Sequence, residues 1–563
     1  MPESRPTGST VIRRSDSLLL TLVLLSLSGA AWLLSWPPID LWPMSFLWAA
    51  LLIRAAIGAR HAWLLSVACL LIYVVCWGWL LRWSSNVSVA GYPAMVIYSA
   101  VWMVFFALLL RRLEHRRPLL NCPLAITAPI TWIALEYLRA EILFGAWPWY
   151  LAGHPLIEWP VICQVADLGG VWLVSMLVLC IGAAGAEWMR PHPRSGQAMT
   201  SSILAACALL ISIGWGVFSL AHRAEPVMGR FLLVQTNVPQ DNKLRWTIEE
   251  QVEDLGSFME LTAGSLKSVG GADVVIWPES MVPGIGFDES MHESLKALNV
   301  TFSGLPSGFW RDQMRTFSNA IDTPMIIGTN TWAGELDVLD EDSGGFLDPE
   351  WQFNSVVLLE PAGVQPYHKI FPTPFGERLP WIDAWPWLRA KLLALGASGL
   401  SLQLDAGPPM VPIELTLNDG TAYRLATPIC FESTVPSITR DLVREREAGL
   451  APSDLIVNIS NDGWFGNVDG GRLSHAQAAR FRCIELRRPM LRCANTGQTA
   501  WFDSAGRVVD SLPLQEAGSM LAEPRLDSRR TLYGMIGNLV PVMCLVFIIM
   551  CFLVSFEARR LKR

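Results

Sequence analysis

Three side chains that could carry out nucleophilic catalysis follow apolar segments of this sequence. They are Glu279, Lys369 and Cys430, and each comes at the end of a predicted strand, just before a turn. A cysteine attacks as its thiolate, a carboxylate can take the thiol proton, and an ammonium group stabilises both the thiolate and the oxyanion of a tetrahedral intermediate. The three residue types together therefore predict covalent catalysis through Cys430.

Each of these residues also has a simpler explanation. A cysteine next to a strand is commonly a small buried apolar residue. Glu279 could cap a helix, and Lys369 could be a solvated loop residue. The catalytic interpretation depends on whether the chain brings the three side chains together.

The segments around the three residues alternate between strand and helix patterns. The predicted strands cover residues 230–235, 272–279, 324–330, 353–359, 364–369, 410–416, 421–429, 454–459 and 490–495, with a hairpin turn at 361–363. The predicted helices cover residues 247–266, 288–298 and 472–487, and another begins near Val435. This alternation indicates layered α/β packing. Because strands of one sheet end at a common edge, distant residues at strand ends can meet there.

The rest of the chain is much more apolar. Of the 563 residues, 52% are hydrophobic and only 17% are charged, which is unusual for a soluble protein. Most of the apolar stretches have close to the roughly 20 residues that cross a bilayer. We predict eight spans, near residues 17–36, 42–58, 61–81, 92–110, 119–138, 169–189, 202–221 and 533–556. The second is short and contains Arg54.

Positive charge alternates between the loops that join these stretches. Basic residues precede the first span, follow the second, fourth, sixth and last, and are sparse in the loops near 37–41, 82–91 and 139–168. The positive-inside rule then places both termini in the cytoplasm. We predict a membrane domain of seven helices at 1–222, a catalytic domain outside the cytoplasm at 223–530, and a final helix with a cytoplasmic tail at 531–563.

The loop at 139–168 is rich in tryptophan, with Trp147, Trp149 and Trp159 among its residues. Tryptophan is common at membrane surfaces, which is one explanation. The other is that this loop lies under the catalytic domain and lines a path for lipid.

Other classes of function find little support. The catalytic part contains Cys430, Cys483 and Cys493, without a CxxC motif or a His/Cys cluster, so we expect no metal ion and no other cofactor. Cys483 and Cys493 could form a disulfide, but two buried thiols are expected. The net charge of −7 and the lack of basic clusters argue against nucleic acid.

Four motifs, taken in order, resemble those of the nitrilase superfamily. They lie at residues 277–280, 369–377, 428–432 and 461–466 and contain Glu279, Lys369 and Cys430. The superfamily uses a Glu–Lys–Cys triad in an αββα sandwich. Such a domain between seven spans and one span resembles the apolipoprotein N-acyltransferase family, as do residues 234–240 and 475–488. The expected fold is therefore an α/β, nitrilase-like αββα sandwich inserted before the last helix of an all-α bundle of about eight transmembrane helices.

The resemblance implies a reaction and a location. Cys430 would take an acyl chain from a membrane phospholipid as a thioester and pass it to the α-amine of a diacylglyceryl-cysteine at a lipoprotein N-terminus. Glu279 would be the base and Lys369 the oxyanion donor. The protein would lie in the bacterial inner membrane with its catalytic domain in the periplasm, and we expect a monomer.

The resemblance also implies supporting residues. Glu377 would hold the lysine or assist the base, and the other supporting positions are Glu432, Phe431, Trp246, Asn354 and Trp464. Phe431 departs from the tyrosine that many family members have there, so the phenol hydroxyl is lost and the ring remains.

A segment directly after Glu377 combines tryptophans with basic residues. Trp381, Trp385 and Trp387 lie within residues 381–393, beside leucines and two basic residues. A short packed helix would explain this pattern. Alternatively, the segment is a lid that dips toward the membrane, because both substrates have acyl chains in the bilayer.

Three other functions remain open. The nearest is a membrane-anchored nitrilase-type amidase with water as acceptor, although seven spans are many for an anchor. A transporter would place more charged residues inside its spans than Arg54 and Glu136. A Cys–His–Asn hydrolase would use His368 or His475, but neither has a convincing spacing and Glu279 and Lys369 would be idle.

Overall fold

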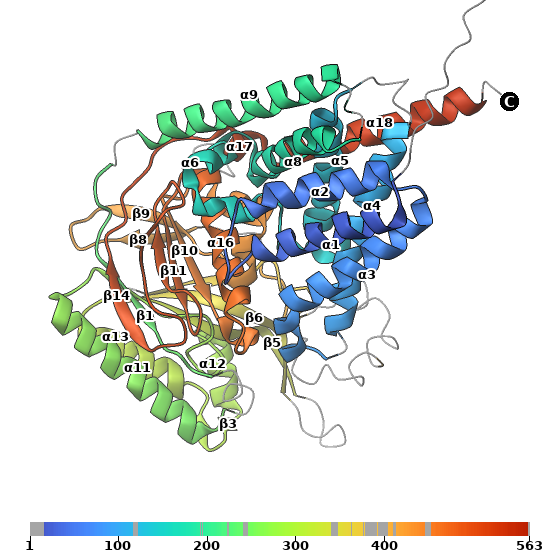
Figure 1. Cartoon of the computed structure of the whole chain (residues 1–563). Coiled ribbons are helices and arrows are strands. Elements are labelled where there is room, and N and C mark those ends of the chain that lie inside the picture. Colours follow the sequence, from blue (N-terminus) through green and yellow to red (C-terminus); the bar gives the residue numbers. More distant parts are fainter. Residues whose placement is uncertain are drawn as a thin grey trace, which may run out of the picture.

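The computed structural model describes most of the 563 residues. The described ranges are 16–89, 91–115, 122–191, 193, 195–221, 225–239, 246–338, 347–361, 363–374, 376–377, 391, 404–408, 412–444 and 452–560. Long helices form one part of the molecule, and two sheets with their own helices form the other (Figure 1).

The helical part contains most of the first 220 residues and one late helix. Its long helices are α1 (Leu18–Leu34), α2 (Met44–Gly58), α3 (Ala62–Leu80), α4 (Gly91–His115), α5 (Leu124–Tyr137), α8 (Val171–Trp188), α9 (Ser195–Leu220) and α18 (Leu539–Arg560). Short helical segments include η1 (Arg82–Asn86), η5 (His154–Glu158), α6 (Pro160–Cys163), α7 (Ala166–Gly169) and α17 (Leu532–Ile536). Helix α18 packs against α5, so the end of the chain returns to the helices formed by its beginning.

Four of these helices are long and apolar enough to cross a membrane. They are α3, α4, α8 and α9, among the described residues and by length and composition. The other four predicted spans coincide with α1, α2, α5 and α18, whose apolar lengths are smaller. The predicted count of eight spans therefore stays a prediction.

The other part is formed mainly by the described residues between 225 and 530 and corresponds to the predicted catalytic domain. It contains two six-stranded sheets. The first has the order β14 (Gly518–Ala522), β1 (Phe231–Gln235), β2 (Val274–Ile276), β5 (Met325–Val338), β6 (Leu347–Glu360) and β7 (Gly363–His368). The second has the order β13 (Val508–Ser511), β12 (Ala500–Phe502), β11 (Met490–Ala494), β10 (Leu455–Ser460), β9 (Ala422–Ala426) and β8 (Ile413–Thr416). The predicted strands coincide with these elements, and the hairpin joins β6 to β7.

The two sheets contact each other through their central strands. Strands β1, β10 and β11 are buried along their whole length, as expected for strands covered on both faces. The Sγ atom of Cys493 in β11 lies 3.3 Å from the carbonyl oxygens of Val234 and Ile276 in the first sheet. Cys483 and Cys493 are free, buried thiols, as expected.

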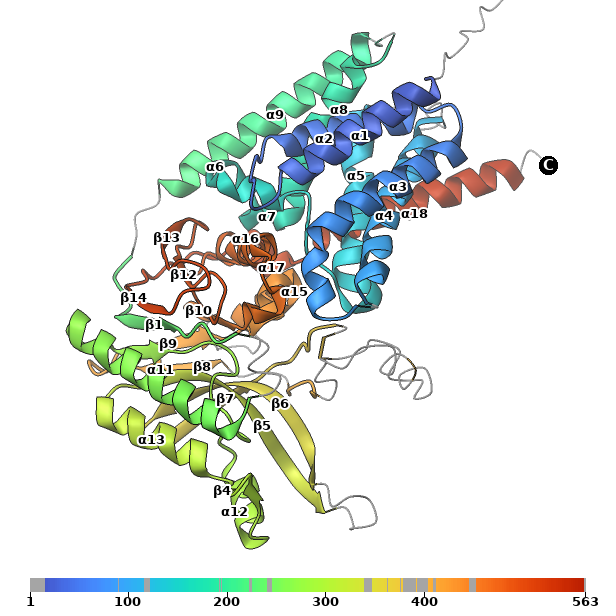
Figure 2. The same cartoon turned by 60° about the horizontal axis from the view of Figure 1, so that its bottom comes forward.

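Helices cover the outer sides of the sheets. Helices α11 (Ile248–Val269) and α13 (Phe309–Ile321) pack on the first sheet around Trp277, and α12 (Glu289–Ala297) packs near the long β5–β6 hairpin. Helices α15 (Pro436–Val443) and α16 (Asp469–Leu486) lie between the second sheet and the membrane helices (Figure 2).

Helix α16 is buried along nearly its whole length because it has protein on both sides. Arg480 forms an ion pair of 2.6 Å with Glu158, and Arg487, just after the helix, forms one of 2.5 Å with Asp167. Buried arginines thus join α16 and the residue after it to the loops between the apolar helices.

Candidate active site

Cys430 lies in a tight turn directly after the second sheet's strand β9. It begins the 3₁₀ turn η7 (Cys430–Thr434), has a φ of +50°, and is partly buried. Burial raises the pKa of the Cys430 thiol, Glu279 raises it further, and Lys369 lowers it. The resting thiol is therefore protonated, and it needs a base to become a nucleophile.

Glu279 follows β2 and is held by donors from both halves of the domain. One carboxylate oxygen accepts a hydrogen bond of 2.7 Å from the side-chain amide of Asn354, and the other accepts one of 2.6 Å from the backbone N–H of Asn461. The residue is 5% exposed. The carboxylate is thus fixed where the two sheets meet, close enough for its charge to act on Cys430.

Lys369 follows β7 and is 1% exposed. Its Nζ atom lies 2.7 Å from Glu377, 3.8 Å from Glu279 and 3.2 Å from the hydroxyl of Thr373. Burial alone would lower the pKa of Lys369, but the two carboxylates outweigh burial and raise it. Burial would likewise raise the pKa of Glu377, but Lys369 lowers it more. Both groups are therefore charged at neutral pH.

Asn354 in β6 connects the two carboxylates of the site. Its side-chain nitrogen donates to Glu279 at 2.7 Å and to Glu377 at 3.2 Å. A carboxylate only accepts hydrogen bonds, so the amide nitrogen rather than the oxygen must face both groups. Asn354 fixes the distance between Glu279 and the pair formed by Lys369 and Glu377.

Glu432 is completely buried and ties the turn of Cys430 to the loop after Lys369. It accepts hydrogen bonds of 2.7 to 2.9 Å from the hydroxyl of Tyr367 and from the backbone N–H groups of Ile370, Phe371 and Ile429. Burial raises the pKa of Glu432 to about 7, against the effects of Lys369 and these donors. The residue is placed to hold two catalytic loops together.

Phe431 turns its ring toward the membrane helices. It stacks on Phe371 with a centroid distance of 6.2 Å and on Trp147 with one of 6.5 Å. Trp147 belongs to the tryptophan-rich loop after α5, so this loop reaches the residue next to Cys430. The contact places this loop against the catalytic domain, while the predicted path for lipid stays a prediction.

Two other predicted supporting residues are Trp246 and Trp464. Trp246 precedes α11 and donates its indole N–H to Asp254 at 2.8 Å. Trp464 is half-buried in the turn η8 (Asp462–Phe465). Their predicted roles stay predictions. The predicted lid with Trp381, Trp385 and Trp387 falls outside the described residues.

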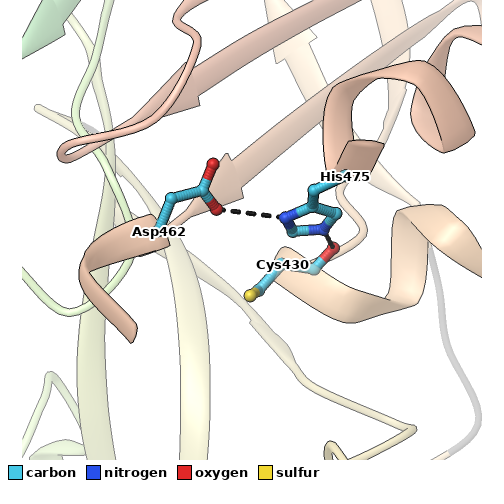
Figure 3. A group of neighbouring side chains, drawn as sticks. All are labelled: Cys430, Asp462 and His475. Carbon is cyan, nitrogen blue, oxygen red and sulfur yellow. Dashed lines mark hydrogen bonds and ion pairs between the residues drawn. The ribbon is translucent and has the colours of Figure 1, made fainter. Parts of the chain in front are cut away.

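A second group of polar residues surrounds Cys430 and was not predicted. Ligand atoms of Cys430, Asp462 and His475 lie within 4.8 Å of one another (Figure 3). The three residues are widely separated along the chain, so the sequence shows no local His/Cys cluster. Two features of the sequence could have indicated this group. They are the predicted strand at 490–495, which contains Arg492, and the motif at 461–466, which contains Asp462.

These three residue types can bind a metal ion, but a cation already lies among them. One guanidinium nitrogen of Arg492 is 2.8 Å from Asp462 and 3.1 Å from His475 Nδ1. Burial would raise the pKa of Asp462, but Arg492 lowers it well below its usual range. The group is therefore a buried ion pair next to an imidazole rather than a set of free ligands.

The sequence of this domain matches a known class of protein. The Carbon-nitrogen hydrolase family model matches residues 233–532, more than half of the chain, so this part is a carbon–nitrogen hydrolase domain. The model of the Apolipoprotein N-acyltransferase N-terminal domain matches residues 28–184, which include most of the membrane helices.

Several relatives match most of the chain. An apolipoprotein N-acyltransferase of Azotobacter vinelandii is 30% identical over 86% of this chain and 86% of its own length. Those of Rhodopirellula baltica and Haemophilus ducreyi are 29% and 28% identical and cover 90% and 93% of this chain and 92% and 94% of their own lengths. The chain belongs to the apolipoprotein N-acyltransferase family. Together with the apolar helices, this membership indicates a membrane-bound protein.

Proposed function

We propose that this protein transfers a fatty acyl chain from a membrane phospholipid, through a thioester on Cys430, to the α-amine of the N-terminal diacylglyceryl-cysteine of apolipoproteins. The observation that carries the proposal is the meeting of three groups at strand ends. A thiol, a fixed carboxylate and a charged ammonium group, from Cys430, Glu279 and Lys369, share one buried site. Membership of the apolipoprotein N-acyltransferase family supports the acceptor.

In the first half-reaction Glu279 takes the thiol proton, and Sγ of Cys430 attacks the ester carbonyl of the phospholipid. Lys369 donates a hydrogen bond to the oxyanion that forms. When the tetrahedral intermediate collapses, the lysophospholipid leaves as an alcohol and carries away the proton from Glu279. The product of this step is the acyl thioester on Cys430.

In the second half-reaction the acceptor amine attacks the thioester carbonyl. Glu279 takes a proton from the attacking amine, and Lys369 again stabilises the oxyanion. The bond between sulfur and carbon breaks, the amide forms, and the thiolate regains a proton. Because each product leaves before the next substrate reacts, the kinetics are ping-pong.

The membrane part has a role of its own in this proposal. The stacking of Trp147 on Phe431 brings an apolar surface to the residue beside Cys430, where the acyl chain must arrive. We propose that residues 1–222 and 531–563 cross the bacterial inner membrane as seven helices and one helix. The αββα domain at 223–530 then lies in the periplasm, and both termini are cytoplasmic.

Intact-mass measurement tests the proposed intermediate. Purified protein incubated with phospholipid vesicles should gain the mass of one acyl chain, and hydroxylamine, which cleaves thioesters, should remove it. The Cys430→Ala variant should gain no mass, whereas the Cys483→Ala/Cys493→Ala variant should react as the wild type does. An adduct that persists in Cys430→Ala would exclude this mechanism.

The acceptor separates the acyltransferase from an amidase that uses water. Addition of a diacylglyceryl-cysteine peptide should discharge the thioester and produce the triacylated peptide. Release of free fatty acid at the same rate with and without the peptide would instead indicate that water is the acceptor.

A further inference from the structure

The carbonyl oxygen of Cys430 is held by two side chains. Ser433 donates its hydroxyl at 2.8 Å. Nε2 of His475 lies 3.3 Å away (Figure 3). The φ of +50° at Cys430 is unfavourable for a residue with a Cβ atom, and such a conformation persists only where the surrounding structure imposes it. The contacts to this carbonyl therefore hold the conformation that aims the thiol.

The hydrogen-bond partners of His475 determine which nitrogen carries its proton. Nδ1 lies 3.1 Å from a guanidinium nitrogen of Arg492, which only donates, and also 3.1 Å from a carboxylate oxygen of Asp462, which only accepts. Nε2 faces the carbonyl oxygen of Cys430, which only accepts. Burial and Arg492 lower the pKa of His475, so the ring is neutral. A proton on Nε2 satisfies the carbonyl of Cys430 and lets Nδ1 accept from Arg492, while Asp462 accepts from Arg492 and Ser460 instead. A proton on Nδ1 would reach Asp462 but would set the lone pair of Nε2 against the carbonyl oxygen, so the single proton lies on Nε2.

The imidazole is held rigidly in this orientation. Arg492 in β11 is paired with Asp462 at 2.8 Å, and the hydroxyl of Ser460 donates to Asp462 at 2.7 Å. The rings of Trp149 and Phe465 lie 5.3 and 5.9 Å from the imidazole by their centroids. Trp149 comes from the loop after α5, so part of this support comes from the membrane helices.

We propose that His475 is a positioning residue for the nucleophile, and that the membrane part completes the active site by packing Trp149 against it. His475 fixes the carbonyl of Cys430 and so the direction of its Sγ toward Glu279 and Lys369, without contacting the substrate. This inference rests on the proposed function of Cys430. The inference assigns a role to the contact between His475 and Trp149, which comes from the loop after α5.

Two substitutions separate positioning from general stability. In His475→Gln the amide nitrogen can take the place of Nε2, whereas in His475→Asn it reaches only the place of Nδ1. The single-turnover rate constant of acylation should fall about 10²-fold in His475→Asn, the scale of a misplaced reacting group, and should return to within about tenfold of wild type in His475→Gln. The vesicle concentration at half-maximal rate should not change.

A second buried histidine provides the control. His292 in α12 also contacts a backbone carbonyl, that of Gly286 at 2.9 Å, and α12 packs on β5, so His292→Asn should acylate at the wild-type rate. Wild-type rates in His475→Asn, or equal losses in the Asn and Gln variants at position 475, would overturn the inference.

A readout without any acyl donor separates this inference from the proposed function. Alkylation of Cys430 by iodoacetamide reports the pKa of a thiol that lies beside Glu279, Lys369 and Asp462. In His475→Asn this pKa should move down toward the ordinary thiol value of about 8.5, because the thiol leaves its buried position. An unchanged pH profile would refute positioning by His475. Failure of the wild type to form an acyl adduct would refute the proposed function instead.

Discussion

Two buried groups of charges flank Cys430, one from each sheet, and they differ in net charge. The acid–lysine cluster of the first sheet consists of Glu279, Lys369 and Glu377, and its two carboxylates exceed its one cation. The arginine cluster of the second sheet consists of Asp462, His475 and Arg492, in which one carboxylate balances one guanidinium and the imidazole is neutral. The first cluster can therefore take up a proton without acquiring a net positive charge, and the second cannot.

The acid–lysine cluster and the arginine cluster also differ in how exposed their side chains are to solvent. The side chains of Asp462 and Arg492 are 0% exposed, whereas that of Glu377 is 17% exposed. A closed, neutral ion pair is suited to holding a backbone in place, while an accessible cluster with an excess carboxylate is suited to proton transfer. Changes in the acid–lysine cluster should therefore affect rate, and changes in the arginine cluster should affect stability and position.

The largest effect on rate is expected for Glu279→Gln. The amide keeps the shape of the carboxylate but cannot take a proton, and loss of a general base costs about 10²–10⁴-fold. Both thioester formation and aminolysis should slow, because each moves a proton, while the melting temperature should change little. Single-turnover measurements of the two half-reactions test this. A half-reaction that proceeds at the wild-type rate would remove Glu279 from that step.

The next largest effect is a loss of stability in the Arg492→Met variant. This substitution leaves the carboxylate of Asp462 buried without its cation, which costs about 3–5 kcal/mol in unfolding free energy. The thermal midpoint in detergent should fall well below that of Glu279→Gln. An Arg492→Met variant as stable as the wild type would mean that the arginine cluster does not support the fold.

A smaller loss of rate is expected for Glu377→Gln. Lys369 loses its nearest carboxylate, at 2.7 Å, and is then drawn toward Glu279, at 3.8 Å, which displaces the oxyanion donor. We expect a loss of about 10²-fold in the maximal acylation rate. If Glu377→Gln instead matched the loss in Glu279→Gln, Glu377 would itself take part in proton transfer.

The smallest effect is a pH dependence of stability that arises from Asp462. Its lowered pKa contributes stability that is complete above the unfolded value of about 3.9 and is lost as the pH falls through the folded value. The wild type should therefore lose its advantage over Asp462→Asn by at most about 1.4 kcal/mol per pH unit below pH 4. Thermal midpoints of both proteins between pH 7 and pH 3 measure this. A difference that stayed constant over this range would show that folding does not lower the pKa of Asp462.

The acid–lysine cluster could be predicted from sequence, and the arginine cluster could not. Glu279, Lys369 and Cys430 each follow an apolar strand, and strand ends meet at a common edge. His475 lies on α16, a helix buried on nearly all sides, so its pattern does not reveal which face contacts the nucleophile. Arg480 and Arg487 near this helix resemble solvated surface residues until their partners in the membrane loops are known.

The sequence by itself determined the order of strands and helices, the two-part composition and the identity of the three reactive groups. These features depend on local apolar patterning and on residue chemistry, which the chain carries wherever it folds. Only the tertiary structure decided that Trp149 packs on His475 and that His475 holds the carbonyl of Cys430. Contacts between distant segments depend on how the layers stack, and spacing along the chain contains no record of that.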